Sequence, residues 1–278
     1  MASADSKVWL ITGSSRGLGR ALAEAVLEDG HRLVASARNP TRLDALCERF
    51  GSHVHPFTHD VTDPRAADLA IKAAVVAYGR LDVVVNNAGY GDIGSVEDTS
   101  VEEIRAQIET NLFGTIYTTK AAIPLMRMQG SGHIVQFSSV GGRIGATGRA
   151  AYSAAKWGVE GFSEALAKEV APLGIKVTIV EPGGFRTDFA GASTKLRAAR
   201  PEYESTVGAA SRYQRDYNGN QPGDPNKAAK VLLKIMELPD PPLRLPLGSD
   251  AVQAIERADL GKFEMDRKWR ALSLSTDY

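Results

Sequence analysis

The sequence predicts a doubly wound α/β fold, in which one parallel sheet is covered by helices on both faces. Over the first 180 residues, short apolar runs alternate with longer segments whose apolar residues recur at helical spacing. The runs are about four residues long and almost wholly apolar, as is typical of strands buried on both faces. No linker rich in Gly, Ser or Pro divides this part. We therefore expect the chain, residues 1–278, to form a single domain.

The six apolar runs in this part are expected to be parallel strands joined by right-handed crossovers. They lie at residues 8–11, 33–36, 53–58, 83–85, 134–137 and 177–180. Helices are expected between them, at residues 20–27, 40–50, 64–78, 101–128 and 150–173. Pro64 suits the first turn of its helix, whereas Pro124 is expected to interrupt the longest one. The ligand crevice of such a sheet lies at the carboxyl ends of its strands.

After Pro182 the pattern changes. Residues 183–225 are polar and contain no clear strand. A segment of this length without its own secondary structure is usually a functional loop or lid, so we expect a substrate-binding loop at about 183–225. Residues 226–238 then predict a helix, and residues 243–247 an edge strand that contains Pro246. Residues 251–270 predict a helix within a C-terminal extension of about 249–278.

The chain is neutral, because 33 Lys and Arg residues balance 33 Asp and Glu residues. A neutral chain exerts no strong attraction on polyanions, so we expect neither a nucleic-acid nor a membrane partner. The single cysteine, Cys47, excludes an intrachain disulfide. No window approaches the apolar length of a signal peptide or a membrane span, which predicts a cytoplasmic location. The five histidines show no metal-ligand spacing, so no metal site is expected.

A glycine-rich turn follows the first strand and opens the first helix. It reads Thr12-Gly13-Ser14-Ser15-Arg16-Gly17-Leu18-Gly19. Glycine allows positive φ and a close approach of the backbone, and a helix N-terminus offers N–H groups and a positive dipole end to a phosphate. A plain turn between strand and helix is the alternative interpretation. The turn lacks the Gly-Lys-Ser/Thr of a P-loop, so nothing supports ATP hydrolysis.

Tyr152 and Lys156 are four residues apart in a predicted helix, so they lie on one face. The Lys156 ammonium can then favour the ionised form of the phenol. A phenol with an ordinary pKa of about 10 is a poor acid–base group at neutral pH, and a neighbouring cation moves the pKa toward the useful range. The alternative is a solvated surface pair, which describes most Tyr/Lys pairs on helices.

Polar residues close two of the predicted strands at the edge of the sheet where the crevice is expected. Ser139 follows the run at 134–137, and Asn87 follows the run at 83–85. Asn111 lies inside the helix predicted at 101–128, where asparagine is unfavourable. Turn chemistry explains Ser and Asn at strand ends equally well, and an exposed position would explain Asn111.

Taken together, these motifs resemble the short-chain dehydrogenase/reductase family. The resemblance is carried by Thr12-Gly13-x-x-x-Gly17-x-Gly19, Asn86-Asn87-Ala88-Gly89, Asn111, Ser139, Tyr152-x-x-x-Lys156 and Pro182-Gly183. The motifs occur in the family's order and spacing over about residues 7–187, whereas residues 188–278 match only loosely. The resemblance implies a Rossmann-type doubly wound parallel sheet. It also implies an oxidoreductase that transfers a hydride between a nicotinamide cofactor and a carbonyl or secondary alcohol.

The resemblance assigns a catalytic role to Asn111, Ser139, Tyr152 and Lys156. Tyr152 is the acid–base that exchanges a proton with the substrate oxygen, and Ser139 hydrogen-bonds the same oxygen. Lys156 lowers the pKa of the phenol and holds the nicotinamide ribose, and Asn111 positions a water that links Lys156 to solvent. The complete set argues against the alternative function, a catalytically silent nucleotide sensor or scaffold of the same fold.

The implied cofactor is NADP(H). Members of the family that prefer NAD usually carry an acidic residue at the end of the second strand, where this chain has Ala37. Arg38 follows it and Arg16 lies in the glycine-rich turn, so two guanidinium groups can clamp a 2′-phosphate; NAD is the alternative cofactor. The implied cofactor contacts are Gly13, Ser15, Arg16, Gly17, Leu18, Gly19, Arg38, Asp60, Val61, Asn87, Ala88, Gly89, Tyr152, Lys156, Pro182, Gly183, Phe185 and Thr187.

The substrate is expected to be a small ketone or alcohol, apolar and of moderate size. Candidate walls of its pocket are five aromatic residues, Phe185, Phe189, Tyr203, Tyr213 and Tyr217. Ordinary packing explains any one of them as well. At the family level a homo-oligomer, dimer or tetramer, is expected through the helices that carry Asn111 and Tyr152. Small residues such as Gly158 and Gly161 permit close helix packing there, or packing on the sheet.

Overall fold

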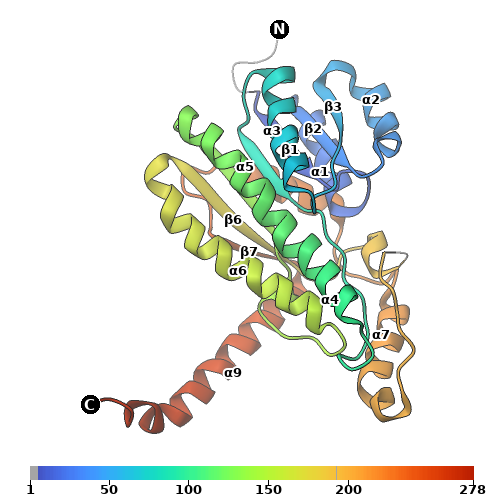
Figure 1. The fold of residues 1–278 in the computed structure, drawn as a ribbon, viewed down its shortest axis with the longest axis vertical. Coiled ribbons are helices and arrows are strands. Elements are labelled where there is room, and N and C mark those ends of the chain that lie inside the picture. The colour runs from blue at the N-terminus through green and yellow to red at the C-terminus, as the bar shows by residue number, and fades with distance from the viewer. Residues whose placement is uncertain (1–5, 192) are drawn as a thin grey trace.

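The computed structural model describes residues 6–191 and 193–278, which form a seven-stranded sheet between two layers of helices (Figure 1). The strand order is β3-β2-β1-β4-β5-β6-β7, and every neighbouring pair is parallel. The strands are β1 (Val8–Thr12), β2 (Arg32–Ala37), β3 (Val54–Thr58), β4 (Val83–Asn86), β5 (Gly132–Phe137), β6 (Ile175–Pro182) and β7 (Arg244–Leu247). The predicted doubly wound α/β class is confirmed, and each predicted strand is present.

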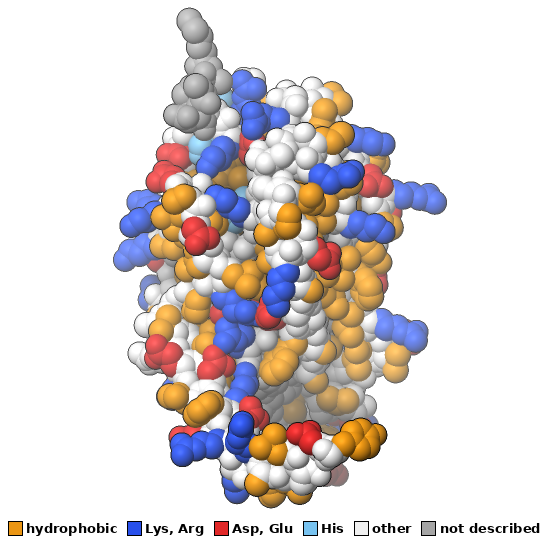
Figure 2. Space-filling model, turned by 90° about the vertical axis from the view of Figure 1, so that its left-hand side faces the viewer, with side chains coloured by type: hydrophobic (Ala, Val, Ile, Leu, Met, Phe, Trp, Pro, Cys, Tyr) orange, Lys and Arg blue, Asp and Glu red, His pale blue; other side chains and the backbone are white. Residues whose placement is uncertain are grey.

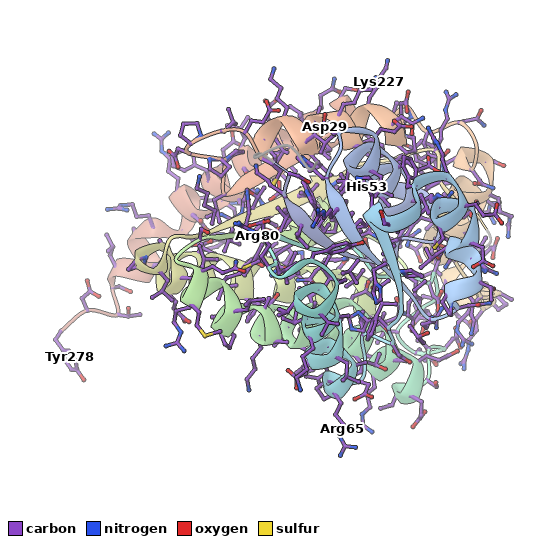
Figure 3. The ribbon with its side chains drawn as sticks, turned by 90° about the horizontal axis from the view of Figure 1, so that it is seen from above. Asp29, His53, Arg65, Arg80, Lys227 and Tyr278 are labelled. Atoms are coloured by element: carbon purple, nitrogen blue, oxygen red, sulfur yellow. The ribbon has the colours of Figure 1, made fainter. Side chains whose placement is uncertain are left out.

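The helices cover both faces of the sheet because the strands are apolar on both faces. They are α1 (Gly17–Glu28), α2 (Asp44–Phe50), α3 (Pro64–Tyr78), α4 (Val101–Ile108), α5 (Gly114–Gln129), α6 (Ala150–Val170), α7 (Ala209–Tyr217), α8 (Pro225–Ile235) and α9 (Ser249–Leu274). In β1, Trp9 packs with the layer of α1, α2 and α8, and Leu10 with the layer of α3, α5 and α6. Figure 3 shows the layers from above, with Asp29 and Lys227 on one side of the sheet and Arg65 on the other.

The strand order reverses at β1, which positions the site. β2 pairs with one edge of β1 and β4 with the other, so Ile11 is in register with both Ala35 and Val85. On one side of β1 the sheet continues through β2 to β3. On the other side it continues through β4, β5 and β6 to β7. A crevice opens where the carboxyl ends of strands diverge in this way.

The long helix predicted at 101–128 is irregular at a different place from the one expected. Pro124 lies inside α5 without interrupting it, because the carbonyl that loses its partner belongs to Lys120, an exposed residue that water can reach. The irregularity is a π-helical turn, Glu109–Phe113, between α4 and α5. Within it, the Asn111 side chain donates from Nδ2 to the carbonyl of Gln107 at 2.8 Å and so takes part in the helical hydrogen bonding.

The prediction of a loop without secondary structure over residues 183–225 is wrong. This segment contains α7 and three short helical turns, Asp188–Ala190, Pro201–Tyr203 and Glu204–Gly208. The sequence gives no helical pattern of apolar residues for α7, because its buried side chains are polar. It is attached by polar contacts: Gln214 donates to the carbonyl of Ala190 and accepts a hydrogen bond from Arg149.

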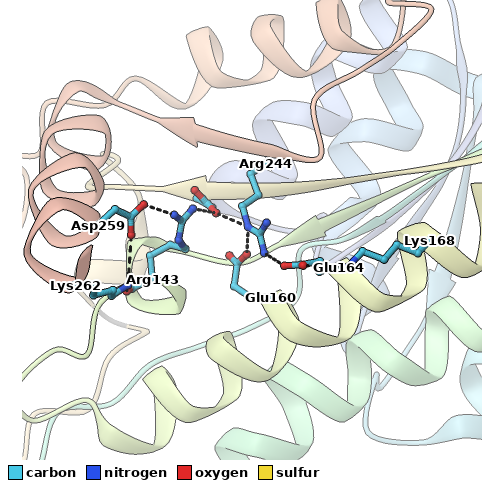
Figure 4. A network of polar contacts seen from close by, with 8 residues as sticks. Arg143, Glu160, Glu164, Lys168, Arg244, Asp259 and Lys262 are labelled. Atoms are coloured by element: carbon cyan, nitrogen blue, oxygen red, sulfur yellow. Dashed lines mark hydrogen bonds and ion pairs between the residues drawn. The ribbon is translucent and has the colours of Figure 1, made fainter. Parts of the chain in front are cut away.

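Charged side chains attach β7 and the base of α9 to the rest of the sheet (Figure 4). Arg244 of β7 donates to Glu160 at 3.0 Å and to Glu164 at 2.7 Å, both on α6. Arg143 donates to Glu181 of β6 at 2.9 Å and also pairs with Asp259 of α9. Glu181 is fully buried, and burial raises its pKa. Beyond this network α9 is exposed along its length and projects from the body (Figure 1).

Charges of both signs are interspersed over the face shown in Figure 2, in line with the neutral composition. Among the described residues, no helix has both the length and the apolar character required to cross a bilayer. In the same part of the chain, no three His, Cys, Asp or Glu side chains are grouped so that they could hold a metal ion.

Candidate active site

A cavity of about 1000 Å³ lies at the carboxyl ends of the strands. Its lining contains every residue that the sequence pointed to as catalytic and all but one of the expected cofactor contacts. The exception is Gly19, which faces Asn87 instead. A Cβ at Gly19 would overlap the Asn87 amide and the carbonyl of Gly13. Gly19 therefore permits α1 to pack closely against the turn after β4.

The glycine-rich turn presents the N-terminus of α1 to this cavity. Gly13 and Gly17 have φ of +71° and +60°, where other residues are strained. Arg16 is the N-cap residue, yet its side chain caps no N–H, and the first turn of α1 contains no acidic residue. The first N–H groups of a helix are unsatisfied by the helix itself. This end of α1 is thus available to an anion such as a pyrophosphate.

The turn after β4 is fastened to the end of β1. The Thr12 hydroxyl accepts hydrogen bonds from the backbone N–H groups of Asn87 and Ala88, each at 3.0 Å. The Asn87 side chain donates back to the carbonyl of Thr12 at 2.9 Å. These bonds hold Asn87, Ala88 and Gly89 along the cavity, so their arrangement depends on more than ordinary turn chemistry.

Lys156 lies at the floor of the cavity, one helical turn after Tyr152 in α6. It is 5% exposed, and its Nζ donates to the carbonyl of Phe137 at 2.6 Å. Burial lowers the pKa of Lys156 to about 8, although the charge of Glu160 acts in the opposite direction. A Cβ at Gly89 would lie 3.6 Å from Nζ and overlap the Asn111 side chain. Gly89, Asn111 and Lys156 therefore converge at one point.

The Asn111 side chain is held by three backbone contacts. Its Oδ1 accepts from the N–H of Tyr90 at 3.2 Å, and its Nδ2 donates to the carbonyls of Tyr90 and Gln107 at 2.9 and 2.8 Å. Asn111 is fully buried, so an exposed position does not explain it. Its bonds join the π-helical turn to the segment after β4, beside Lys156.

Tyr152 is buried, and burial raises the pKa of its phenol. The Ser139 hydroxyl and the charge of Arg149 act in the opposite direction, but burial prevails, so the predicted lowering of the phenol pKa by Lys156 is not found. Ser139 is itself oriented by the N–H of Gly141, which donates to its hydroxyl at 3.0 Å. Lys156 Nζ lies 5.8 Å from the centroid of the Tyr152 ring. The phenol and the Ser139 hydroxyl thus share one place in the cavity.

Arg149 is a residue of the site that sequence reasoning missed. It lies one helical turn before Tyr152, and its guanidinium carbon is 5.8 Å from the centroid of the Tyr152 ring. The spacing i, i+3 was a signal that could have found it. His59 was also missed; it lines the cavity beside Asp60, and burial lowers its pKa to about 4.

At the other end of the cavity, Arg16, Arg38 and Ala37 line the space after β2. Asp60 also lies there. Burial opposes its ionisation, but hydrogen bonds from the N–H and hydroxyl of Thr62 and the charge of Arg38 hold its pKa below the ordinary value. The two arginines and the uncapped end of α1 place positive charge at this end. A phosphate-bearing ligand fits this donor set.

Four of the five predicted aromatic residues line the substrate end: Phe185, Phe189, Tyr213 and Tyr217. The Phe189 ring lies 5.8 Å from the Tyr152 ring. The expectation for Tyr203 is wrong, because its hydroxyl donates to Glu97 at 2.9 Å in an exposed position outside the cavity. Thr187 and Pro182 to Phe185 form the edge between the two ends.

The fold and this constellation define a nicotinamide-type dehydrogenase site, and the chain belongs to the short-chain dehydrogenase/reductase family. The family model described as "short chain dehydrogenase" matches residues 7–198. The chain is 48% identical over 272 residues to "Oxidoreductase BOA17" of Botryotinia fuckeliana, covering 98% of this chain and 99% of that protein.

Solved structures agree with this assignment. A short-chain dehydrogenase from Streptomyces avermitilis is 39% identical, with a TM-score of 0.92 over 99% of this chain and 100% of that one. An alcohol dehydrogenase from Thermococcus sibiricus, complexed with 5-hydroxy-NADP, is 26% identical, with a TM-score of 0.71 over 87% of this chain and 96% of that one. The chain is therefore an oxidoreductase of this family.

Proposed function

We propose that this oxidoreductase uses NADP(H) and interconverts a carbonyl compound with a secondary alcohol. The observation that carries the proposal is the meeting of Tyr152, Ser139, Lys156 and Asn111 in the cavity that also holds the uncapped end of α1. One continuous space therefore joins an anion-binding helix end to an acid–base group. A bound nicotinamide would supply or accept the hydride there.

The chain's own residues would hold the cofactor by charge and backbone contacts. The N-terminus of α1 would take the pyrophosphate, and Arg16 and Arg38 would take the 2′-phosphate. No acidic residue stands at Ala37 to repel that phosphate. The structure of the relative from Thermococcus sibiricus, which is complexed with an NADP derivative, is in line with this choice.

The proton transfer would be carried out by Tyr152. In the reducing direction its O–H gives a proton to the substrate oxygen as negative charge develops there, and Ser139 donates a second hydrogen bond to the same oxygen. The ammonium of Lys156 would stabilise the phenolate that remains. Asn111, held by three backbone contacts, would keep open the route by which the proton is replaced.

The test is turnover by the purified protein with NADPH and a panel of neutral ketones, followed at the nicotinamide absorbance. We expect Tyr152→Phe to lose roughly 10²–10⁴-fold in kcat while it keeps its affinity for NADPH. Turnover that survives this substitution would contradict the assigned acid–base. Tight NADPH binding without turnover of any ketone or alcohol would favour a nucleotide sensor instead.

The cofactor is decided by the same assay with the unmodified protein. We expect kcat/KM for NADPH to exceed that for NADH by about a hundredfold, because two charge-assisted contacts to the 2′-phosphate are lost with NADH. A preference for NADH would refute the role given to Arg16 and Arg38.

A further inference from the structure

The substrate end of the cavity contains a guanidinium group that protein partners only partly satisfy. Arg149 donates from Nη1 to the carbonyl of Gly91 at 3.0 Å and from Nη2 to Oε1 of Gln214 at 2.9 Å. Both acceptors are neutral. A guanidinium has five N–H groups, so three of them have no acceptor among residues 6–191 and 193–278, and Arg149 lines the cavity.

The negative charges around Arg149 are engaged elsewhere. Asp92 is the carboxylate that most affects it, yet its Oδ1 accepts from the N–H of Lys195 at 2.9 Å. Glu103 pairs with Arg197, and Asp250 accepts from the N–H of Gly184 at 2.7 Å. Within the described part of the chain, no carboxylate oxygen lies within 4.0 Å of the Arg149 guanidinium. A largely buried cation without a direct ion-pair partner is costly to a fold.

Arg149 lies beside the aromatic rings at the substrate end of the cavity. Its guanidinium carbon lies 5.8 Å from the centroid of the Tyr152 ring and 5.9 Å from that of Phe189. Gly91 permits this approach, because a Cβ there would lie 2.8 Å from the Tyr152 ring and 2.9 Å from Arg149 Nη1. An anion bound at Arg149 would therefore lie in the same cavity as an oxygen held by Tyr152 and Ser139.

We propose that Arg149 is a carboxylate-binding subsite, and that the substrate is a compact ketone or secondary alcohol bearing a carboxylate. The inference rests on the proposed function, because it concerns the substrate of the same site. Arginine binds carboxylate through two parallel N–H bonds, and the three N–H groups without an acceptor in the described part of the chain suffice for this. The rings of Tyr152 and Phe189 would contact the apolar body of the substrate.

The experiment compares two nearly isosteric ketones, 4-oxocyclohexanecarboxylate and 4-oxocyclohexanecarboxamide, with the 278-residue chain and NADPH. For the unmodified protein we expect kcat/KM to favour the carboxylate by about ten- to a hundredfold. Arg149→Met should reduce this ratio to about one. Arg149→Lys keeps the positive charge but loses the two parallel N–H donors of the guanidinium, so an intermediate ratio is expected. Arg257→Met removes an exposed arginine of α9 as the matched control and should keep the full ratio.

The ratio separates a binding role from a purely structural one, because a structural defect lowers activity toward both ketones equally. Equal activity toward the two ketones in the unmodified protein, or a ratio that survives Arg149→Met, would overturn the subsite while leaving the oxidoreductase intact. Failure to reduce any ketone, charged or neutral, would count against the proposed function itself. If Arg149→Met does not fold, the unmodified protein still decides the question. Cyclohexanecarboxylate must then inhibit reduction of a neutral ketone at least tenfold more strongly than cyclohexanecarboxamide.

Discussion

At Lys156 function and stability conflict, because the proposed mechanism uses an ammonium group whose burial destabilises the folded chain. Burial lowers its pKa from 10.5 to about 8. At neutral pH the folded chain therefore keeps a charge that it would hold more easily when unfolded. Between about pH 8 and 10.5 the unfolded chain binds more protons at this group than the folded chain, so the free energy of unfolding rises with pH there. Active sites commonly carry such a cost.

We expect Lys156→Met to be more stable than the unmodified protein at pH 7, and inactive. Because the cost of the charge fades as Lys156 loses its proton, the difference in unfolding free energy should narrow from about pH 8 to about 10.5. Urea unfolding of both proteins at about pH 7, 9 and 10.5 measures this difference. Lys168→Met, an exposed lysine of the same helix, is the matched control and should show no such trend. A difference in unfolding free energy that does not change with pH would contradict a buried charge on Lys156.

At the scale of the element, β7 shows how a weak strand is retained at the edge of a sheet. It has four residues, one of them Pro246, and most of its side chains are only partly buried. Its side chain Arg244 reaches Glu160 and Glu164 on α6 and lies 3.6 Å from Glu181. Removal of the Arg244 guanidinium takes the ion pair from the buried Glu160, whereas Glu181 keeps its pair with Arg143.

We expect Arg244→Met to lower the free energy of unfolding by about 2–3 kcal/mol. This is below the range for fully buried pairs, because Arg244 is partly exposed. Urea unfolding at pH 7 measures the loss. Arg200→Met, which breaks the surface pairs with Glu97 and Asp98, should cost no more than about 1 kcal/mol. Equal losses of unfolding free energy for the two substitutions would show that Arg244 stabilises the fold no more than an ordinary surface ion pair does.

The elements also show where sequence patterns fail. The helix predicted at 64–78 matches α3 to the residue, because a proline start and a strong apolar stripe mark it. The segment 183–225 was misjudged, because α7 buries Ser211 and Gln214 rather than apolar residues. The π-helical turn at Asn111 has no local pattern either. It depends on hydrogen bonds to Tyr90, which lies 21 residues away in the chain.

At the scale of the whole molecule, assembly remains a prediction. Of the small residues in α6, Gly158 packs against Leu112 of the π-helical turn in the same chain, whereas a Cβ at Gly161 would meet nothing within 4 Å. Trp157 lies on the same helix and is 48% exposed, and Phe113 is exposed as well. Exposed apolar side chains of this kind are what a contact with a second copy would cover.

We expect light scattering to give two or four times the chain mass of 29.7 kDa. Gly161→Glu, which adds a charge at the open position, should shift the protein toward the monomer without lowering its melting temperature by more than a few degrees. The exposed Val76→Glu on α3 is the matched control and should leave the mass unchanged. A monomer of the unmodified protein at micromolar concentration would refute the prediction.

The local signals in the chain were sufficient for the fold class, for the glycine-rich turn and, through the family resemblance, for Asn111, Ser139, Tyr152 and Lys156. Each of these depends on periodicity or on a short motif, both of which are properties of neighbouring residues. Contacts between distant segments decided the rest. Arg149 is held by Gly91 and Gln214, which lie 58 and 65 residues away, and Gly19 is packed against Asn87. No pattern of neighbours contains such contacts, so the charge beside Tyr152 and the close packing at Gly19 became visible only in the folded chain.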